Sequence, residues 1–538
     1  MALKDKLVNL EDLKVVGDAV GDLKSAMHYK PLAIDPAGNY QLFEMPSAFT
    51  GTYLPVNIYT DGEKFATDFD AGKFKNTGGT TIYVAPIADG GVSTNDGKTP
   101  QTPKNLYNAI NTVATSGDTV ILLPGFYTSS DTSSLTSNSF DKSINVIGRD
   151  RVVWCIDGVL YKAQQSKAYD STNQLWTCTR SSAGLVISSK DHRFAYTKVT
   201  SLATCQATPK SWYFSSGTVY INDTEEPDAI IITERDGIVL TPTVSRQMYF
   251  ENILFVGGKW SFQFNNPSSG TLTAVFNNCI FTRTYGSYSN ISVKGGNVLF
   301  YHCEASYSSR DGFSYSPSTG STVQFVEIDC CGENNGLQKT DSQSVDNGST
   351  AHSGATGIRV NGIYQNNWGA NVADVQSGTM SVNLGCTALN SCGNDAYNEG
   401  FSAQQPGTTM WLYNCKAAGN IRDINAVTDN GQSSTVYATD CDFQTMRIGS
   451  GNIVISGGRI IQSGNLNDYT EEGIYKVLRG SIAQSLSNCP VTTMFVMQVY
   501  NMDTIYTKQI IFADDGIYSR RATAANTWGV WRHASLVT

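Results

Sequence analysis

Apolar residues recur every three or four positions near the N-terminus, with polar residues between them. They are Leu3, Leu7, Leu10, Leu13, Val16, Val20, Leu23 and Met27. This spacing is typical of a helical heptad seam, and over residues 1–27 it favours a short parallel coiled coil between identical chains. A lone amphipathic helix docked on its own chain is the alternative. The pattern predicts a segment for trimerisation and attachment, and hence a homotrimer.

Alternation with a period of two replaces the helical pattern in the middle of the chain. Six segments share an apolar residue, a second residue two positions later, and Cys two positions after that. They are Val275/Asn277/Cys279, Leu299/Tyr301/Cys303, Val326/Ile328/Cys330, Val382/Leu384/Cys386, Trp411/Tyr413/Cys415 and Tyr437/Thr439/Cys441. A copy with Gly362 in place of Cys divides the one long interval. This self-similarity predicts a solenoid whose strands turn these residues, and a column of cysteines, toward the interior.

The region before the repeats predicts how the solenoid begins. Residues 28–75 carry four prolines among short β-prone runs and predict a small irregular adaptor. From residue 82 the chain reads as a strand, an Asp-Gly turn, an amphipathic helix over about 104–114, and a strand over 119–123 that ends in Pro-Gly-Phe. An open solenoid end exposes unpaired backbone and apolar core, so we expect this helix to cap it.

Two stretches of the sequence resemble known families. Residues 82–127, with "IYVAP" and "GDTVILLPGFY", resemble the first coil of the pectate-lyase-like right-handed β-helix superfamily found in phage tail spikes and tail fibres, and a weaker likeness extends to about residue 461. Residues 465–538, with "LNDYT", "NCP" and the terminal "WGVW", resemble the pyocin-knob domains at the tips of tail fibres. The resemblance implies an all-β chain with a right-handed parallel β-helix over 76–464 and a small knob over 465–538.

Composition and charge narrow the possible partners. Only 16% of residues are charged, and the chain has 27 Tyr, 22 Phe and 8 Trp, which favours strands over helices. A formal charge of -9 argues against a nucleic-acid or anionic-membrane partner. No apolar run approaches the roughly 18 residues that span a bilayer, and the N-terminus lacks the apolar core of a secretory signal. We therefore expect a virion tail protein that is made in the host cytoplasm and released by lysis.

Twelve cysteines are spread thinly along the chain, and no CxxC pair occurs. Without an export signal we expect them to be reduced rather than paired in disulfides. The spacing predicts no zinc site. No other motif indicates a metal or a cofactor.

Charged residues fall at corresponding positions of the repeats. Stacking in register would place Glu327 beside Arg359 and Asp329 beside His302, on outward-facing columns whose members lie about 4.8 Å apart. Glu327 and Asp329 would share one face of their strand. A carboxylate pair of this kind is typical of acid–base chemistry on sugars. A simple cross-strand ion pair is the alternative for Glu327 and Arg359.

A second set of acids precedes the following strand of each repeat. It includes Asp311, Asp374 and Asp395, and neighbouring carboxylates raise one another's pKa unless a cation or donor relieves them. His352 lies in a polar turn before the Arg359 strand and is a candidate general base. The alternatives are solvated turn acids, and turn residues that bond their own backbone.

Aromatic residues near these columns could stack on sugar rings, although Phe313 and Phe401 fit better as interior ladders. The predicted catalytic residues are Asp311, Glu327, Asp329, His352 and Asp374. The predicted substrate-binding residues are Arg359, Trp368, Asp395 and Tyr397.

Three functions are compatible with the sequence. The first is a phage or phage-like tail spike or fibre that recognises a bacterial surface glycan and joins the baseplate or tail through its N-terminus. The second is a depolymerase, a hydrolase or lyase, acting on the same glycan. The third is a structural baseplate protein without a ligand.

Overall fold

The computed structural model describes most of the chain after residue 39. The described residues are 40–132, 134–233, 236–267, 269–286, 288–336, 346–393, 397–429, 432–443, 446–447, 451–456, 459–461, 463–470, 473–477, 480–501, 507–524 and 527–535. The predicted coiled coil over 1–27 lies outside this set, and so does Asp395. In these ranges no helix has the length and hydrophobicity to cross a membrane.

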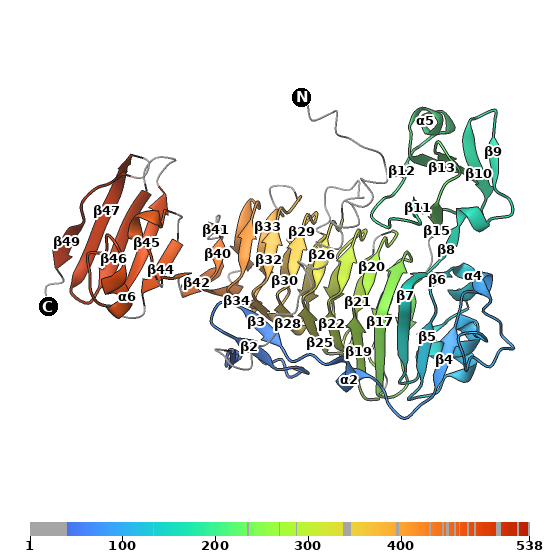
Figure 1. Cartoon of the computed structure of the whole chain (residues 1–538), viewed down its shortest axis with the longest axis horizontal. Coiled ribbons are helices and arrows are strands. Elements are labelled where there is room, and N and C mark those ends of the chain that lie inside the picture. Colours follow the sequence, from blue (N-terminus) through green and yellow to red (C-terminus); the bar gives the residue numbers. More distant parts are fainter. Residues whose placement is uncertain are drawn as a thin grey trace.

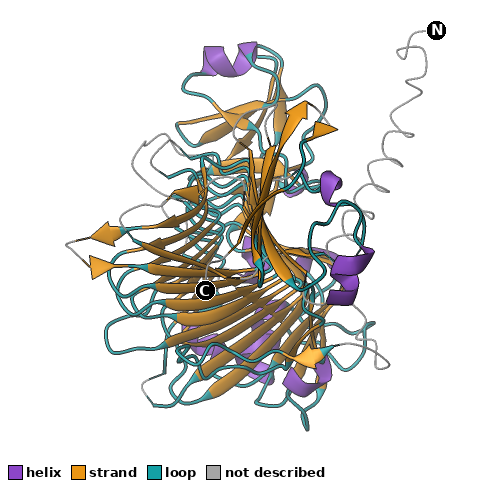
Figure 2. Cartoon of the chain, turned by 90° about the vertical axis from the view of Figure 1, so that its left-hand side faces the viewer, coloured by secondary structure: helices purple, strands orange, loops and turns teal. Residues whose placement is uncertain are grey.

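A parallel β-solenoid of about twelve turns forms the body of the molecule, as the sequence predicts (Figure 1). Figure 2 views it along the long axis, with the strands of successive turns stacked behind one another. The first sheet contains β4 (Thr81–Val84), β5 (Thr119–Leu122), β7 (Asn145–Cys155), β17 (Arg246–Val256), β19 (Leu272–Asn277), β22 (Gly296–Tyr301), β25 (Val323–Ile328), β28 (Thr356–Val360), β31 (Met380–Leu384), β34 (Thr409–Tyr413), β39 (Thr435–Thr439) and β42 (Asn452–Ser456).

Two further sheets complete each turn. The second sheet contains β6 (Gly125–Tyr127), the distal halves of β7 and β17, β20 (Ile280–Thr282), β23 (Glu304–Ser306), β26 (Cys331–Glu333), β29 (Ile363–Gln365), β32 (Thr387–Leu389), β35 (Lys416–Ala418) and β40 (Asp442–Phe443). The third is nine-stranded and contains β16 (Ile238–Leu240), β18 (Phe262–Phe264), β21 (Ile291–Val293), β24 (Phe313–Tyr315), β27 (Ser349–His352), β30 (Val372–Val375), β33 (Glu399–Gln404), β36 (Arg422–Ala426) and β41 (Met446–Arg447).

A corner residue after each strand of the first sheet decides which side chains face the interior. Asn278, Asp329 and Asn361 have φ of 53°, 51° and 52°, in the left-handed region. The bend at the corner breaks the alternation, so the cysteines face inward as predicted. Val275 and Asn277, with their counterparts in the other repeats, face outward instead, which corrects our prediction for both positions. The interior positions of the first sheet belong to the residues between, beginning with Phe276.

The outward apolar column of the first sheet is covered by the chain's own N-terminal part. Residues 40–75 form β1 (Gln41–Leu42), β2 (Ile58–Thr60), β3 (Phe65–Thr67) and α2 (Ala71–Phe74), and run along this sheet. Val56, Ile58 and Phe65 pack on the column. Phe69 stacks on Tyr301 with ring centroids 3.8 Å apart. The segment predicted as an irregular adaptor is therefore, from residue 40 onward, a strap bound to the solenoid.

The capping helix is present at the first turn. It comprises α3 (Leu106–Asn108) and the continuous η3 (Ala109–Val113), so it begins two residues later than the predicted 104. Asn105 Oδ1 accepts a hydrogen bond from the Asn108 N–H at 3.0 Å, which fixes the start. Lys142 Nζ donates to the Ile110 carbonyl at 2.7 Å. Leu106 and Ile110 are fully buried in the core that they close.

An insertion that the sequence analysis missed follows the first turns. It contains β8 (Gly158–Leu160), η5 (Tyr161–Ala163), β9 (Ala168–Asp170), β10 (Leu175–Thr179), β11 (Leu185–Ser188), β12 (Thr197–Lys198), α5 (Leu202–Ala207), β13 (Ser211–Ser215), β14 (Thr218–Asn222) and β15 (Ala229–Ile232). Two small sheets enclose its cores. Arg283 of the solenoid donates to the His192 carbonyl at 2.8 Å, and Glu304 lies 3.5 Å from Arg193 Nη2.

A separate sheet lies beyond the last turn of the solenoid (Figure 1). It contains β43 (Arg459–Ile460), β44 (Gly473–Val477), β45 (Phe495–Asn501), β46 (Thr507–Ala513), β47 (Gly516–Ala524), β48 (Thr527–Trp528) and β49 (Arg532–Ser535), with α6 (Gly480–Ser485) beside it. Arg520 is held between the rings of Trp528 and Trp531, at 4.5 and 4.3 Å from their centroids. The residues that resemble a pyocin knob thus form one packed sheet.

Candidate functional site

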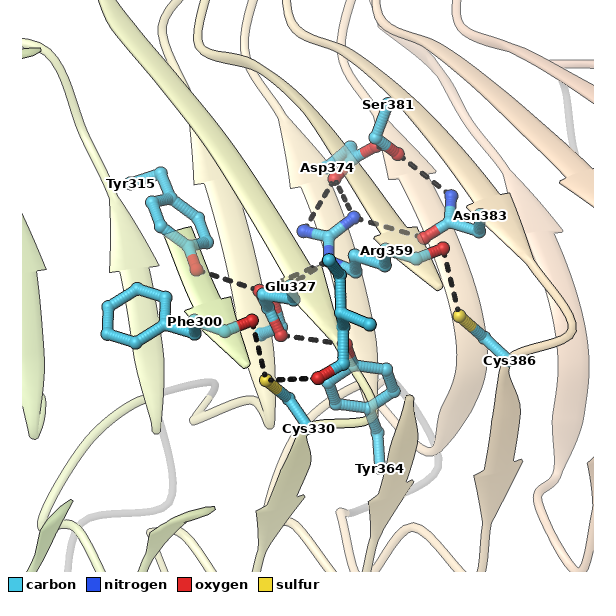
Figure 3. A network of polar contacts seen from close by, with 12 residues as sticks. Phe300, Tyr315, Glu327, Cys330, Arg359, Tyr364, Asp374, Ser381, Asn383 and Cys386 are labelled. Atoms are coloured by element: carbon cyan, nitrogen blue, oxygen red, sulfur yellow. Dashed lines mark hydrogen bonds and ion pairs between the residues drawn. The ribbon is translucent and has the colours of Figure 1, made fainter. Parts of the chain in front are cut away.

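Three of the predicted site residues meet inside the solenoid (Figure 3). Arg359 Nε lies 3.6 Å from Glu327 Oε1, and Arg359 Nη1 lies 3.2 Å from Asp374 Oδ1. Ser349 joins the two halves, since its hydroxyl donates to Glu327 Oε1 at 2.6 Å and accepts from Arg359 Nε at 2.8 Å. Glu327 also accepts from the Tyr315 and Tyr364 hydroxyls at 2.9 and 2.7 Å. The result is a hydrogen-bonded charged layer in the lumen.

The charged layer corrects the predicted placement of these residues. The register of Glu327 opposite Arg359 is as predicted. However, the side chains of Glu327 and Arg359 have no exposed area, and Asp374 is equally buried. They face inward because they occupy the interior position between two outward apolar residues. A polymer outside the solenoid cannot reach them, so the ion-pair interpretation is the one that fits.

Burial and charge oppose each other within the charged layer. Burial raises the pKa of Asp374, while Arg359 and the Ser381 hydroxyl, both bonded to its carboxylate, counteract the rise. Burial would lower the pKa of Arg359, but Asp374 and Glu327 hold it above its usual value. The arginine therefore stays charged between two acids.

The repeat copy without Cys makes room for part of this layer. A Cβ at Gly362 would lie 2.5 Å from the Tyr364 hydroxyl, so a cysteine there would collide with it. Tyr364 fills the space and reaches Glu327. The apolar interior is divided at this level, with one cluster ending at Ala355 and the next beginning at Tyr364.

Asp329 lies on a different face from Glu327, which corrects the predicted carboxylate pair. It is the corner residue of its turn and lies 3.3 Å from His302 Nε2, as the register predicts for that pair. Asn361 Nδ2 donates to Asp329 Oδ1 at 3.1 Å and to the Phe65 carbonyl at 3.1 Å. The N-terminal strap therefore lies against this corner, and Asp329 belongs to a ladder of turn residues.

The outer face of the nine-stranded sheet contains an open groove. Its floor consists of two outward columns in register: Gln263, Ser292, Ser314, Thr350 and Ala373 in one, and Lys294, Ser316, His352, Val375 and Gln404 in the other. Turn residues border both edges, among them Tyr288, Arg310, Asp311 and Asn347 on one side and Gln376 and Gln405 on the other. The lined volume is about 530 Å³. Small side chains on the floor leave this space open.

Two predicted catalytic residues line the groove together. Asp311 Oδ1 accepts a hydrogen bond from the Asn347 N–H at 2.9 Å, and Oδ2 lies 3.4 Å from the Ser289 hydroxyl. Burial raises the pKa of Asp311, while the Asn347 hydrogen bond opposes the rise. Burial, with a contribution from the charge of Lys294, lowers the pKa of His352 to about 4. The groove thus combines a carboxyl that retains its proton to higher pH with an imidazole that is neutral at pH 7.

The aromatic candidates Trp368 and Tyr397 are not among the residues that line the groove. Trp368 and Tyr397 are half-buried, and a Cβ at Gly393 would lie 2.8 Å from the carbonyl oxygens of both. They belong to turns that lead into β30 and β33. Phe313 and Phe401 are fully buried in the lumen, as their interpretation as interior ladders predicted.

Sequence reasoning missed several groove residues. Lys294, Arg310, Asn347 and the border glutamines were not among its candidates. The sequence signal that could have identified them is a pair of small or polar residues two positions apart along strands of the third sheet, as in Ser292 with Lys294. These strands are only three or four residues long, so their alternation of interior and exterior residues is too short to align one repeat with the next.

Several solved structures are similar to the chain. An R2-type pyocin tail fibre is 25% identical over 14% of this chain and 32% of the fibre, with a TM-score of 0.14, so the match spans about a third of that fibre. Pectate lyase Pel9A is 18% identical over 66% of this chain and 81% of the lyase, with a TM-score of 0.32. An Acinetobacter phage tailspike is 9% identical over 85% of this chain and 83% of the tailspike, with a TM-score of 0.28. No protein-family model matches, and no curated protein does.

The sequence resembles tail fibres, tailspikes and pectate lyases, and proteins of these three classes are also among the similar solved structures.

Proposed function

We propose that the chain is the receptor-binding spike or fibre of a phage or phage-like particle, and that the groove binds a surface polysaccharide of the host. The observation that carries this proposal is the open polar groove on the nine-stranded sheet. Its floor repeats hydroxyl groups from one turn to the next, as in Ser292, Ser314 and Thr350. Repeats about 4.8 Å apart on a rigid sheet suit a ligand that is itself an extended polymer.

Polysaccharide binding also agrees with the other lining residues. Amide groups of Gln263, Gln376 and Gln404 supply donors and acceptors along the groove, and Tyr288 presents a ring that is 40% exposed. Polar groups beside an exposed aromatic ring are the usual means of holding a sugar. A purely structural baseplate role would leave this groove without a ligand.

Depolymerisation is the second candidate, favoured by Asp311 and His352 in the same groove. Glycan cleavage needs one group that donates a proton and one that accepts it. The raised pKa of Asp311 suits the donor, and the neutral imidazole of His352 suits the acceptor. Glu327 and Asp374 have no part in this proposal because their side chains face the interior, and Asp329 has none because it lies at a corner beside the N-terminal strap.

A block of the groove tests the proposal. Ser292→Trp fills the floor with an indole, and Thr387→Trp makes the same change at a half-exposed outward position of β32, on the second sheet. We expect Ser292→Trp to abolish binding of the labelled protein to cells of strains that the wild type binds, while Thr387→Trp binds normally. Equal binding by both variants would reject the groove as the receptor site.

Product analysis separates the binder from the enzyme. The wild type, Asp311→Asn and His352→Gln are incubated with polysaccharide from a bound strain, and new reducing ends or 4,5-unsaturated ends are measured. Cleavage by the wild type that falls by orders of magnitude in both variants, with binding retained, supports the depolymerase. Binding without cleavage by the wild type supports the receptor-binding fibre alone.

We also propose that residues 1–27 join three chains and attach them to a baseplate or tail protein of the virion. The heptad seam supports this assembly. The mass in solution of the whole chain and of a variant lacking 1–27 tests it. A monomeric whole chain would reject the trimer.

A further inference from the structure

We propose that the glycan bound in the groove is anionic, and that Lys294 and Arg310 hold its carboxylate or phosphate group. This inference rests on the proposed function and specifies the chemical class of its ligand. It begins from the positions of the two cations. Lys294 follows β21 in one outward column of the floor, and Arg310 lies in the turn before β24 at the groove edge.

The two cations reach the groove from opposite ends of neighbouring strands. β21 pairs with β24 in register, so consecutive turns of the solenoid, about 4.8 Å apart, carry them. Lys294 comes after the carboxyl end of its strand, whereas Arg310 comes before the amino end of the next. A ligand that crosses the floor at Ser292 and Ser314 therefore passes between them.

Neither cation has an ion-pair partner among the described residues, although the charge of Asp311 acts on both. Within the described ranges, Lys294 and Arg310 form no ion pair, whereas cations elsewhere do, as Arg246 does with Asp141 at 3.0 Å and Arg422 with Glu399 at 3.0 Å. Asp311 is the one acid among the residues that line the groove. Its carboxylate already accepts the Asn347 N–H. The groove thus carries positive charge on a chain whose net charge is -9.

A neutral glycan would leave these two cations without an ion-pair partner. Lys294 is half-buried, so the site already removes water from its ammonium; this burial lowers the pKa of Lys294, and the charge of Asp311 opposes the change. A ligand covering the groove would remove more water, and a buried charge without a partner is strongly unfavourable. An anionic sugar supplies the missing partner through charge-assisted hydrogen bonds. The position of the cations therefore selects for acidic over neutral polymers.

Charge removal in the protein and in the glycan tests this inference. Polysaccharide is purified from strains that the labelled protein binds, and is measured as isolated, after reduction of its carboxyl groups, and after cleavage of its phosphodiesters. Lys294→Gln and Arg310→Gln are compared with Lys416→Gln, which removes an exposed lysine from β35 on another face. We expect each groove variant to bind roughly tenfold more weakly, and Lys416→Gln to bind as the wild type does.

The chemical treatments identify the anion. Loss of binding after carboxyl reduction assigns a carboxylate, and loss after phosphodiester cleavage assigns a phosphate. If Ser292→Trp abolishes binding while both charge variants and both treated glycans bind normally, the ligand is neutral; the anion inference is then rejected and the proposed function stands. If Ser292→Trp also binds normally, or no polysaccharide binds, both are rejected.

Discussion

Replacing Arg359 by Met should destabilise the middle of the solenoid without affecting glycan binding. The side chain is fully buried between Glu327 and Asp374, at 3.6 and 3.2 Å from their carboxylates. Met has a similar length but no charge, so Arg359→Met leaves two buried carboxylates without their cation. The groove lies on the outer face of the third sheet and does not include Arg359.

The size of the effect follows from the burial. Removing one partner of a buried ion pair costs about 3–5 kcal/mol, because the remaining charge is left in a medium that solvates it poorly. Two carboxylates lose their partner here, but each keeps hydroxyl donors, such as Tyr315 for Glu327 and Ser381 for Asp374. We therefore take about 3 kcal/mol as the expected loss, which corresponds to roughly a hundredfold change in a local opening equilibrium.

Amide hydrogen exchange measures this loss at the right place. Solenoid turns contact mainly their neighbours, so opening near β25, β28 and β31 can exceed opening elsewhere. Protection in peptides from these strands should fall roughly a hundredfold in Arg359→Met, while protection in the knob strands β45 and β46 stays unchanged. The loss should be greater at pH 8 than at pH 5. The reason is that burial raises the pKa of Asp374 and Arg359 no longer opposes the rise, so protonation of the Asp374 carboxyl relieves the loss only at low pH.

A variant with the whole charged layer removed provides the control. Glu327→Gln, Arg359→Met and Asp374→Asn together leave no buried charge, so protection should recover most of the loss. Unchanged protection in Arg359→Met would refute the assignment of this layer to stability. Loss of glycan cleavage in Glu327→Gln with full amide protection would also refute this assignment, because a catalytic acid, and not a stabilising one, gives that result.

Two further predictions concern other buried groups. The interior thiols of Cys303, Cys330 and Cys415 should resist labelling until the protein unfolds, whereas Cys392, which is exposed, should react at once; rapid reaction of all four would contradict the observed register. Burial would raise the pKa of Glu304, but His192 and Arg193 of the insertion lower it to about 2. Ionised Glu304 therefore contributes about 3 kcal/mol to the free energy of unfolding. This contribution is present above pH 4.5 and is lost as the pH falls toward 2. Limited proteolysis of the insertion should therefore accelerate at low pH in the wild type, and Glu304→Gln, already lacking this contribution, should be as susceptible at pH 7.

The repeat pattern predicted the solenoid and its lateral pairs, because parallel strands in register make sequence spacing a map of neighbours. Glu327 opposite Arg359 and Asp329 beside His302 follow from that spacing alone. The faces were assigned wrongly because the pattern was read as one unbroken strand. The signal that could have prevented this was Asn278 and its counterparts before each cysteine, since Asn tolerates the left-handed conformation of a corner.

The groove and the insertion could not be predicted in the same way. The insertion has its own short alternating strands, which look like further solenoid turns in the sequence. The groove depends on which of three sheets each short strand joins, and its columns connect residues as far apart as Ser314 and Thr350. Asp311 and His352 were found because acids and histidines are scarce. Lys294 and Arg310 can be recognised as candidate ligand-binding residues only from the structure, which places both in the lining of one groove.

The charged layer also bears on how the solenoid finds its correct alignment. Turns that present similar apolar interiors can stack in the wrong order, since Phe, Val and Cys columns fit one another at several offsets. Skipping one turn would set Glu327 against Asn383 in place of Arg359, and would bury two unmatched charges. Such an arrangement is disfavoured by several kcal/mol. The charged layer therefore distinguishes its turns from turns with apolar interiors, and favours a single order of stacking.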